Sequence, residues 1–348
     1  MPKINKTNQV SADHYNAYNE ARNLMKEMDI QSLPVDPFKL AEQLNIELIT
    51  YAEADELFPE RVIKLRNKKI DAVVIKPDYL NDEYFILYDN LRPNDRIRFT
   101  IAHEIGHIRI GHMNKQYTQF TRYAYNKMTD PIEQEAESFA GELLRPPLLL
   151  SLVNAEAPHL IQSICNISHT AAEVGSRKVT KLKQQSRKPL DPFVQFYSTQ
   201  FHDFIYQKYC PKCKHYFISS TAQYCSKCGS TSLLWGHGHS SKYDSVEEKR
   251  HMIYDGYELD KNGKALVCPR CNNEEIHPDY PFCKICGTYL INKCAGKFSY
   301  DDDGEEYQVA ESCNTVAEGN QRFCYKCGGI TTYYKAKLLL PWEKKQSI

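Results

Sequence analysis

The residues that point most directly to chemistry lie in the stretch 98–107. Its segment His103-Glu104-Ile-Gly-His107 has the pattern H-E-x-x-H. In a helix, residues four positions apart lie one turn apart on the same face, so the two imidazoles project together. Two such imidazoles can bind one Zn²⁺, and the glutamate that follows the first histidine can reach a water molecule at the metal. The pattern therefore predicts a metal site with Glu104 as a general base.

The residues around this pattern have the periodicity of a helix. Ile97, Ile101, Ile105 and Ile108 recur at intervals of three and four residues and form one apolar stripe. The two histidines lie away from that stripe. We therefore expect a helix that packs its isoleucines against a core, presents the histidines to a metal, and ends near Gly111.

A third ligand must come from elsewhere, because a catalytic zinc takes three protein ligands and leaves one position for water. A second helix is expected to begin with Asp130 as N-cap and Pro131 at its first position. On a helical wheel Glu133 lies at the margin of its apolar stripe, and Glu137 lies one turn behind. We therefore favour Glu133 as the third ligand and Glu137 as a carboxylate that orients a ligand.

Three alternatives remain open for these polar residues. Glu135 projects from the opposite margin of the same helix and is the main rival to Glu133. Asp130-x-x-Glu133 also fits a capping box, which would give Glu133 a structural role. His112 follows His107 by five residues, whereas the metzincin pattern places its third histidine six residues on. His112 is therefore expected either to contact a metal ligand without binding the metal itself or simply to stand at the end of the helix.

The elements that must position these residues precede them in the chain. An amphipathic helix is expected over residues 12–28, and a second helix should begin at Pro37 with Asp36 as its N-cap. Strand-like runs follow at residues 46–51, 61–65, 70–76 and 84–88. Together they predict a small sheet packed beside the H-E-x-x-H helix.

Three segments resemble the ImmA/IrrE family of metallopeptidases, over roughly residues 10–190. They are Pro34-Val-Asp36, Arg98-Phe-Thr-Ile-Ala-His-Glu-Ile-Gly-His107 and Glu133-Gln-Glu-Ala-Glu137-Ser-Phe-Ala-Gly-Glu-Leu-Leu-Arg-Pro146. The resemblance implies a thermolysin-like zinc site with His103, His107 and Glu133 as ligands and Glu104 as base. It also implies intracellular cleavage of a helix-turn-helix repressor, so that repression is relieved under stress. The sequence departs from the family at Glu137, where asparagine or aspartate is usual.

Residues 158–184 predict two short helices with a tight turn, a helix-turn-helix-like element. The second helix runs into basic residues, namely Arg177, Lys178, Lys181, Lys183, Arg187 and Lys188. These residues could contact nucleic acid. We prefer the simpler interpretation, a helical hairpin packed on the preceding domain with a solvated basic end.

The second half of the chain contains a repeat of cysteines. Cys210-x2-Cys213-x11-Cys225-x2-Cys228 recurs 58 residues later as Cys268-x2-Cys271-x11-Cys283-x2-Cys286. Each Cys-x2-Cys knuckle supplies two thiolates, so each set of four predicts a structural zinc site in a zinc ribbon. Zinc should supply most of the folding energy of such small modules.

Cys294, Cys313, Cys324 and Cys327 form a looser third set, in which a hairpin around Asp303-Gly304 separates the first two cysteines. Twelve cysteines thus divide into three sets of four, although pairing across modules is an alternative. The thirteenth, Cys165, is expected to be a small buried apolar residue.

Composition limits the remaining possibilities. The chain of 348 residues has 44 basic and 44 acidic side chains, so its net charge does not indicate a polyanionic partner. Neither a signal peptide nor an 18-residue apolar run is evident. We therefore expect a cytoplasmic protein without a membrane partner, in which clustered cysteines bind metal rather than form disulfides.

These observations predict an α+β protein with four modules. A zincin-like metallopeptidase domain, with a small sheet and active-site helices, should occupy residues 1–195 and include the helix-turn-helix-like element 158–184. Ribbon 1 (205–235), ribbon 2 (263–290) and ribbon 3 (291–335) should follow. The expected cofactors are one catalytic and up to three structural Zn²⁺ ions. We predict an endopeptidase acting on a protein, with ribbons that recognise the substrate or a partner; the alternative is a non-catalytic zinc-dependent regulator that binds a repressor or nucleic acid.

Overall fold

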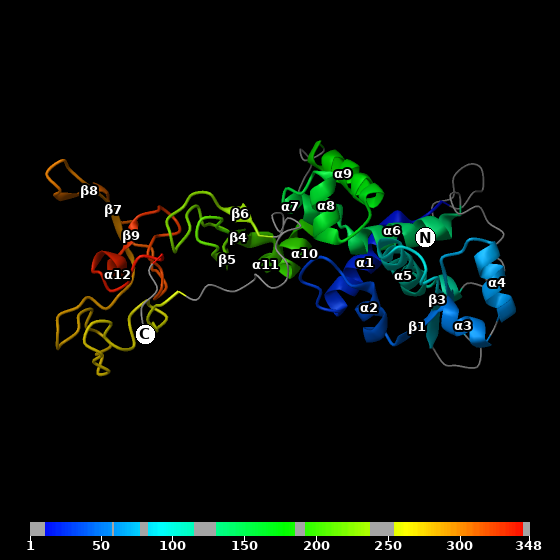
Figure 1. Ribbon diagram of the computed structural model, residues 1–348, viewed down its shortest axis with the longest axis horizontal. Helices are drawn as coiled ribbons and strands as arrows, with labels where there is room; N and C mark the ends of the chain where they lie inside the picture. Colours follow the sequence, from blue (N-terminus) through cyan, green and yellow to red (C-terminus); the bar gives the residue numbers. More distant parts are fainter. Residues whose placement is uncertain are drawn as a thin grey trace. The chain divides into compact units, whose positions relative to one another are not determined.

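The chain divides into two compact units, Met1–Ile205 and Tyr206–Ile348. The structure, a computed structural model, describes residues 11–57, 59–76, 83–114, 130–184, 192–236 and 254–343 (Figure 1). The first unit mixes helices with one small sheet, as expected of an α+β domain. In these described ranges, no helix has both the length and the apolar character needed to cross a membrane.

The first two helices begin where the sequence predicts. Helix α1 (His14–Glu27) is capped by Asp13, whose side chain accepts a hydrogen bond from the Asn16 amide. Helix α2 (Pro37–Gln43) has Asp36 as its N-cap and proline at its first position. The amphipathic patterns predicted the buried faces in part, because α1 buries Leu24 and Met25 but leaves Tyr15 64% exposed.

The sheet of the first unit contains β1 (Ile46–Thr50), β2 (Ala72–Ile75) and β3 (Tyr84–Tyr88), in the order β1-β3-β2. Strand β1 runs parallel to β3, and β2 runs antiparallel to it. Three of the four predicted strands are therefore confirmed. Strand β2 lies at an edge of this sheet, with β3 as its neighbour in the described residues.

The predicted strand at residues 61–65 is wrong. This segment belongs to α4 (Pro59–Asn67), which follows another helix, α3 (Tyr51–Leu57). Val62 and Leu65 are buried, whereas Ile63 is 52% exposed. The three-residue spacing of the buried pair suits one face of a helix, and tertiary packing thus overrides the β propensity of Val62-Ile63.

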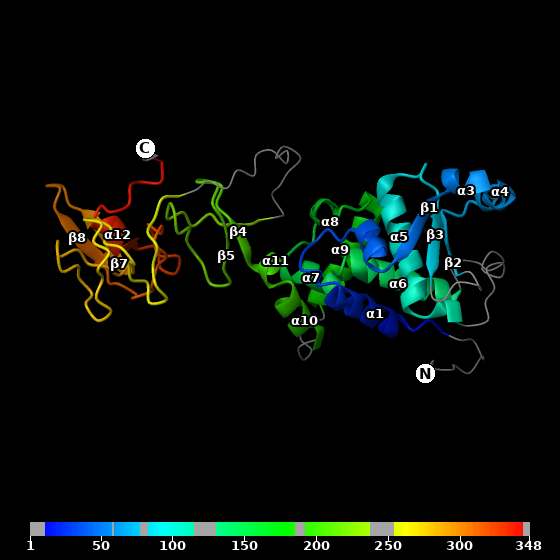
Figure 2. The same ribbon diagram turned by 90° about the horizontal axis from the view of Figure 1, so that it is seen from below.

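The two faces of the sheet contact different helices. Val73 and Leu87 pack in one cluster with Tyr51 of α3 and Val62 of α4. Because side chains alternate along a strand, Val74 lies on the opposite face. Helix α5 (Asn94–Arg109), which carries the H-E-x-x-H pattern, contacts β2 and β3 (Figure 2). The sheet thus supports the helix from which the candidate metal ligands project.

Helix α6 (Pro131–Leu144) packs closely against α5 and α1. A Cβ atom on Gly106 of α5 would lie 2.9 Å from the Phe139 ring of α6, so the glycine permits this close approach. Asp130 caps the helix by accepting from the Ile132 amide, and Arg145 is its C-cap before α7 (Pro147–Leu152). The expected beginning of this helix is therefore confirmed.

Residues 158–184 form the predicted pair of helices, α8 (Pro158–Cys165) and α9 (His169–Gln184), with Asn166 left-handed at the turn. Helix α9 packs against α7 and α8. Its Lys183 pairs with Glu156. These contacts agree with a hairpin packed on the domain, while Arg187 and Lys188 lie outside the described residues.

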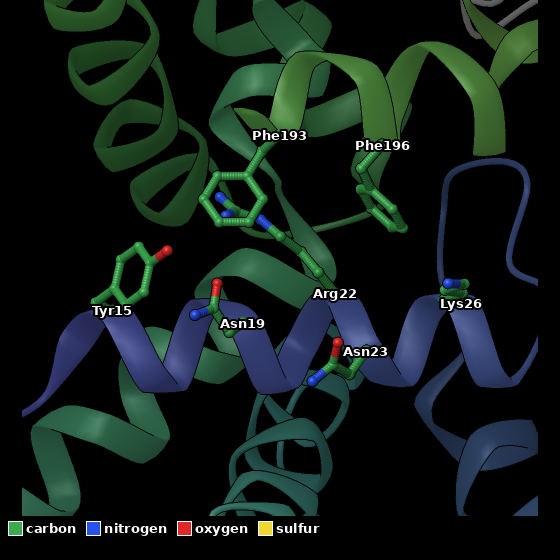
Figure 3. Close-up of a pocket in the computed structure, with 7 residues that line it drawn as sticks. All are labelled: Tyr15, Asn19, Arg22, Asn23, Lys26, Phe193 and Phe196. Carbon is green, nitrogen blue, oxygen red and sulfur yellow. The ribbon is translucent and has the colours of Figure 1, made fainter. Parts of the chain in front are cut away.

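Two further helices extend the first unit, α10 (Pro192–Gln200) and α11 (His202–Tyr206). Glu142 of α6 accepts hydrogen bonds from Arg22 of α1 (2.9 Å) and from Tyr197 of α10 (2.7 Å). The Arg22 guanidinium also lies 3.7 Å from the centre of the Phe193 ring, beside an open pocket of about 380 Å³ between α1 and α10 (Figure 3). Helix α10 thus belongs to the first unit, which continues past the expected boundary at residue 195.

Two small sheets lie in the described part of the second unit. Ribbon 1 holds β4 (Gln207–Tyr209), β5 (Tyr216–Ile218) and β6 (Leu234–Trp235), in the order β5-β4-β6. Ribbon 3 holds β7 (Cys294–Tyr300), β8 (Glu306–Ala310) and β9 (Ile330–Thr331), in the order β8-β7-β9, followed by α12 (Thr332–Lys335). The predicted hairpin at Asp303-Gly304 joins β7 to β8, and Gly304 has φ +82°. Ribbon 2 has isolated bridges such as Phe282 with Tyr289.

Candidate metal centres

Three side chains from two helices of the first unit converge on one point. The Nε2 atoms of His103 and His107 on α5 lie 3.1 Å apart. A carboxylate oxygen of Glu133 on α6 lies 3.3 Å from the first of these nitrogens, and its other oxygen lies 3.5 Å from the second. With bonds of about 2.1 Å to a tetrahedral zinc, ligand atoms lie about 3.4 Å apart. The spacing of the three groups fits one zinc ion.

The environment of Glu133 favours its charged form. Burial alone would raise the pKa of this carboxyl group, but hydrogen bonds and charge interactions with His103 and His107 outweigh that effect. The pKa of Glu133 therefore falls well below its usual range. Asp130 caps the Ile132 amide, and both carboxylate oxygens of Glu133 face the histidines. These contacts support the ligand position for Glu133 over the alternative of a capping box.

Glu104 lies beside the histidine pair and is buried. Ligand atoms of His103, Glu104 and His107 lie within 4.8 Å of one another. One carboxylate oxygen of Glu104 accepts a hydrogen bond from the Val74 amide of strand β2 at 2.8 Å. The sheet edge thus fixes this carboxylate next to the position where a metal would bind.

A chain of hydrogen bonds leads away from His107. Its Nδ1 lies 2.9 Å from Nδ1 of His112, and Nε2 of His112 lies 2.9 Å from Oε2 of Glu135. The other oxygen of Glu135 accepts from the Asp13 amide at 2.8 Å. An ionised carboxylate only accepts, so His112 donates through Nε2 and accepts from His107 at Nδ1. This arrangement leaves the Nε2 lone pair of His107 available for a metal.

Glu135 therefore occupies the position that the sequence suggested for Glu137. Glu137 is exposed. Burial lowers the pKa of Arg145, and the charge of Glu137 opposes that shift, which places Glu137 near Arg145. The prediction that Glu137 orients a ligand is therefore wrong, and Glu135 has this position instead. Because Glu135 binds His112 and the Asp13 amide, its carboxylate does not face His103 and His107. The short helix η1 (His112–Asn114) makes this possible by returning His112 towards His107, which residue spacing did not reveal.

Arg98 ties the site helix to the segment before α2. The side chain is buried and donates a hydrogen bond to the carbonyl oxygen of Val35 at 2.5 Å. Burial lowers the pKa of Arg98, while the nearby charge of Asp36 opposes this shift. Two of the segments quoted for the family resemblance, at residues 34–36 and 98–107, are therefore in direct contact.

The twelve clustered cysteines fall into the three predicted sets, and none forms a disulfide. Within the sets, pairs of sulfur atoms lie 3.5 to 3.6 Å apart. Four thiolates around zinc at about 2.3 Å would have sulfur atoms about 3.8 Å apart, so each set fits a tetrahedral site after a small expansion. The sets are Cys210, Cys213, Cys225 and Cys228; Cys268, Cys271, Cys283 and Cys286; and Cys294, Cys313, Cys324 and Cys327.

Cysteines of different modules do not mix in these sets. Cys165 is fully buried in the first unit, and burial raises its pKa to about 12. It is therefore held as an apolar thiol, as the sequence predicts.

Comparison with known proteins identifies one part of the chain. Residues 60–167 match the family model of the IrrE N-terminal-like domain, a peptidase family. The matched segment is shorter than the range 10–190 over which the sequence shows resemblance, but it contains all four residues of the candidate centre. No curated protein matches the chain. The match supports a metallopeptidase-type domain of the ImmA/IrrE family within residues 60–167.

Proposed function

We propose that the protein is a zinc-dependent endopeptidase that acts on a protein substrate. The convergence of His103, His107 and Glu133 at ligand spacing, with the buried carboxylate of Glu104 beside them, carries this proposal. A site used only to hold a metal has no need for that fourth, acidic group. The three cysteine sets would each hold one structural zinc ion, in addition to the catalytic one.

Each residue of the centre has a distinct task in peptide hydrolysis. His103, His107 and Glu133 would hold the zinc ion, which when bound supplies a Lewis acid that polarises water and the scissile carbonyl. Glu104 accepts a proton from the attacking water and then passes it to the leaving amine, which completes the cleavage. Glu135 and His112 keep His107 in the tautomer that a metal ligand requires.

The edge of the sheet offers a place for the substrate. Strand β2 lies at the edge of the described sheet and contacts α5, and Glu104 binds the backbone of Val74 in this strand. An extended peptide that adds to this edge by main-chain hydrogen bonds would bring its own backbone next to Glu104. An extended segment of the substrate is thus the form that the site accepts.

The resemblance to the ImmA/IrrE family favours a helix-turn-helix repressor as the substrate, cleaved in the cytoplasm in response to stress. The ribbons would recognise this substrate or another protein partner. The β7–β8 hairpin supports protein over nucleic acid, because its acidic residues are all exposed and would repel a phosphate backbone. These residues are Asp301, Asp302, Asp303, Glu305 and Glu306.

The substitution Glu104→Gln tests the proposed function. The assay is cleavage of a helix-turn-helix protein encoded next to this chain, with zinc content measured in parallel. Glu104→Gln should keep its zinc and lose cleavage by at least about a hundredfold, because the general base is removed while the ligands stay in place. The exposed Glu137 provides a matched control, and Glu137→Gln should cleave like the unmodified chain. Equal cleavage by the Glu104→Gln variant would show that this centre is not the peptidase site. Absence of cleavage by the unmodified, zinc-loaded chain would favour the non-catalytic regulator.

A further inference from the structure

The second cysteine knuckle has the same backbone geometry in all three ribbons. Each has the form Cys-x2-Cys-Gly, and in each the glycine amide donates to the carbonyl of the first cysteine at 2.9 Å. The glycines have φ between +69° and +74° and are Gly229, Gly287 and Gly328. A surface built from one of these knuckles can therefore be compared directly with the same surface of the other two.

The knuckles of ribbons 1 and 3 pair with each other through reciprocal hydrogen bonds. The carbonyl of Tyr325 accepts from the amides of Gln223 (2.9 Å) and Tyr224 (3.1 Å). In the opposite direction, the carbonyl of Ser226 accepts from the amides of Arg322 and Phe323, both at 3.0 Å. Ser226 and Tyr325 occupy equivalent positions, and so do the two donor pairs. The contact thus has the pattern of a local two-fold axis.

Side chains follow the same reciprocal pattern. The Phe323 ring covers Gly229, since a Cβ atom there would lie 2.9 Å from that ring. The Tyr224 ring covers Gly328, where a Cβ atom would lie 2.5 Å from it. Each knuckle therefore contributes an aromatic side chain just before its first cysteine and a glycine just after its second. The two surfaces are complementary because each carries both parts.

Ribbon 2 has both parts of this surface uncovered. Phe282, at the position of Tyr224 and Phe323, is 54% exposed, and a Cβ atom on Gly287 would meet nothing within 4 Å. Within the described ranges, the Phe282 amide donates no backbone hydrogen bond and the Lys284 carbonyl accepts none. Ile285 of the same knuckle is 66% exposed. The donor, the acceptor and the glycine are thus uncovered, and the ring of Phe282, which contacts Tyr289 within ribbon 2, keeps an exposed side.

We propose that ribbon 2 pairs with ribbon 2 of a second copy of this chain, in the manner of ribbons 1 and 3. Contacts across a two-fold axis require a surface that is complementary to itself, and the pair of ribbons 1 and 3 shows that two knuckles of this form can meet in that way. Phe282 of each copy would cover Gly287 of the other, and its amide would donate to the Lys284 carbonyl.

The proposed contact should be weaker than the internal one. Pro281 stands where Gln223 and Arg322 each supply an amide donor, and proline has none. One hydrogen bond per copy remains in place of two. The surface of one knuckle is also small compared with a stable protein interface. The expected result is a dimer that forms and dissociates with protein concentration in the micromolar range.

Sedimentation equilibrium of the zinc-loaded full chain over a range of concentrations tests this proposal. Two variants address its two parts. Phe282→Ser removes the ring, and Gly287→Asn fills the space above the glycine with a residue that tolerates positive φ. Each should raise the dimer dissociation constant by about tenfold or more. Aromatic anchors dominate such contacts, and the first variant removes the anchor while the second blocks the place that it would fill. Tyr300→Ser, which removes an exposed ring of ribbon 3, is the matched control and should leave the constant unchanged.

The zinc content of each variant shows whether its ribbons still fold, and either variant with full zinc content decides the question. A monomeric wild-type chain throughout the concentration range would overturn the proposal, even if ribbon 2 binds another protein. Unchanged association of a fully zinc-loaded Phe282→Ser or Gly287→Asn chain would overturn it as well. Neither result depends on peptidase activity, so the proposed function stands or fails separately.

Discussion

Replacing Glu135 by glutamine should weaken zinc binding at the histidine site although Glu135 is not a ligand. Both oxygens of this carboxylate accept hydrogen bonds, one from the Asp13 amide and one from His112. A glutamine side chain has one acceptor oxygen and one NH₂ group. Whichever way the amide turns, its NH₂ group faces a donor, either the Asp13 amide or the His112 imidazole. One of the two contacts must therefore be lost or reversed.

The size of the effect follows from these contacts. The Asp13 amide is exposed and can bind water instead, whereas His112 is buried, and an unsatisfied buried hydrogen-bonding group costs about 1 to 3 kcal/mol. If the NH₂ group faces His112, this imidazole must accept at Nε2 and donate at Nδ1. His107 would then accept at Nδ1 and carry its proton on Nε2, the atom that should bind zinc. Loss of such supporting contacts typically weakens metal binding about 10- to 100-fold, which corresponds to about 1.4 to 2.7 kcal/mol.

Zinc affinity can be measured on the full chain by competition with a chelator. The zinc ion bound at the histidine site is identified as the one that a His107→Ala chain does not bind. Glu137→Gln makes the same chemical change two residues along the same helix, at an exposed position, and should bind zinc like the unmodified chain. Unchanged zinc affinity of the histidine site in Glu135→Gln, or an equal loss of affinity in Glu137→Gln, would refute the role given to Glu135.

Two further predictions concern the first unit. A fragment ending at residue 205 should match the stability of this unit in the full chain, whereas one ending at 195 should lose about 3 kcal/mol or more, because the buried rings of Tyr197 and Phe201 are removed. Helical circular dichroism during urea unfolding measures both, and equal stabilities would contradict the packing of α10. Burial raises the pKa of Cys165 to about 12, so the native zinc-loaded chain should leave this thiol unreacted by iodoacetamide at about pH 8, while urea should expose it. Peptide mass spectrometry detects the alkylated residue, and rapid labelling in the native chain would disprove its burial.

The sequence predicted those parts of the site that depend on local spacing. His103 and His107 lie one turn apart, so any helix brings them together. Glu133 could be chosen over Glu135 because its position on the wheel faces the neighbouring helix. The cysteine sets were predictable for the same reason, since their knuckles are built from short repeated segments.

Features that depend on the path of the chain between elements were not predictable from spacing. Glu135 rather than Glu137 contacts His112 because η1 returns that histidine towards α5. The helix α4 was mistaken for a strand because Val62-Ile63 has the composition of one, and only the packing of Val62 and Leu65 against the sheet distinguishes the two. The length of the first unit was underestimated because the contact of Tyr197 with Glu142 joins residues distant in sequence.

The contact between ribbons 1 and 3 has a consequence for how the second unit assembles. The amides that bind the Ser226 carbonyl belong to residues 322 and 323, which follow ribbon 2 in the sequence. During synthesis ribbon 1 therefore leaves the ribosome without its neighbour and must keep the Gly229 surface uncovered until ribbon 3 has been made. Ribbon 2 lies between them in sequence, so the chain must loop back over a whole module before its earliest ribbon is completed.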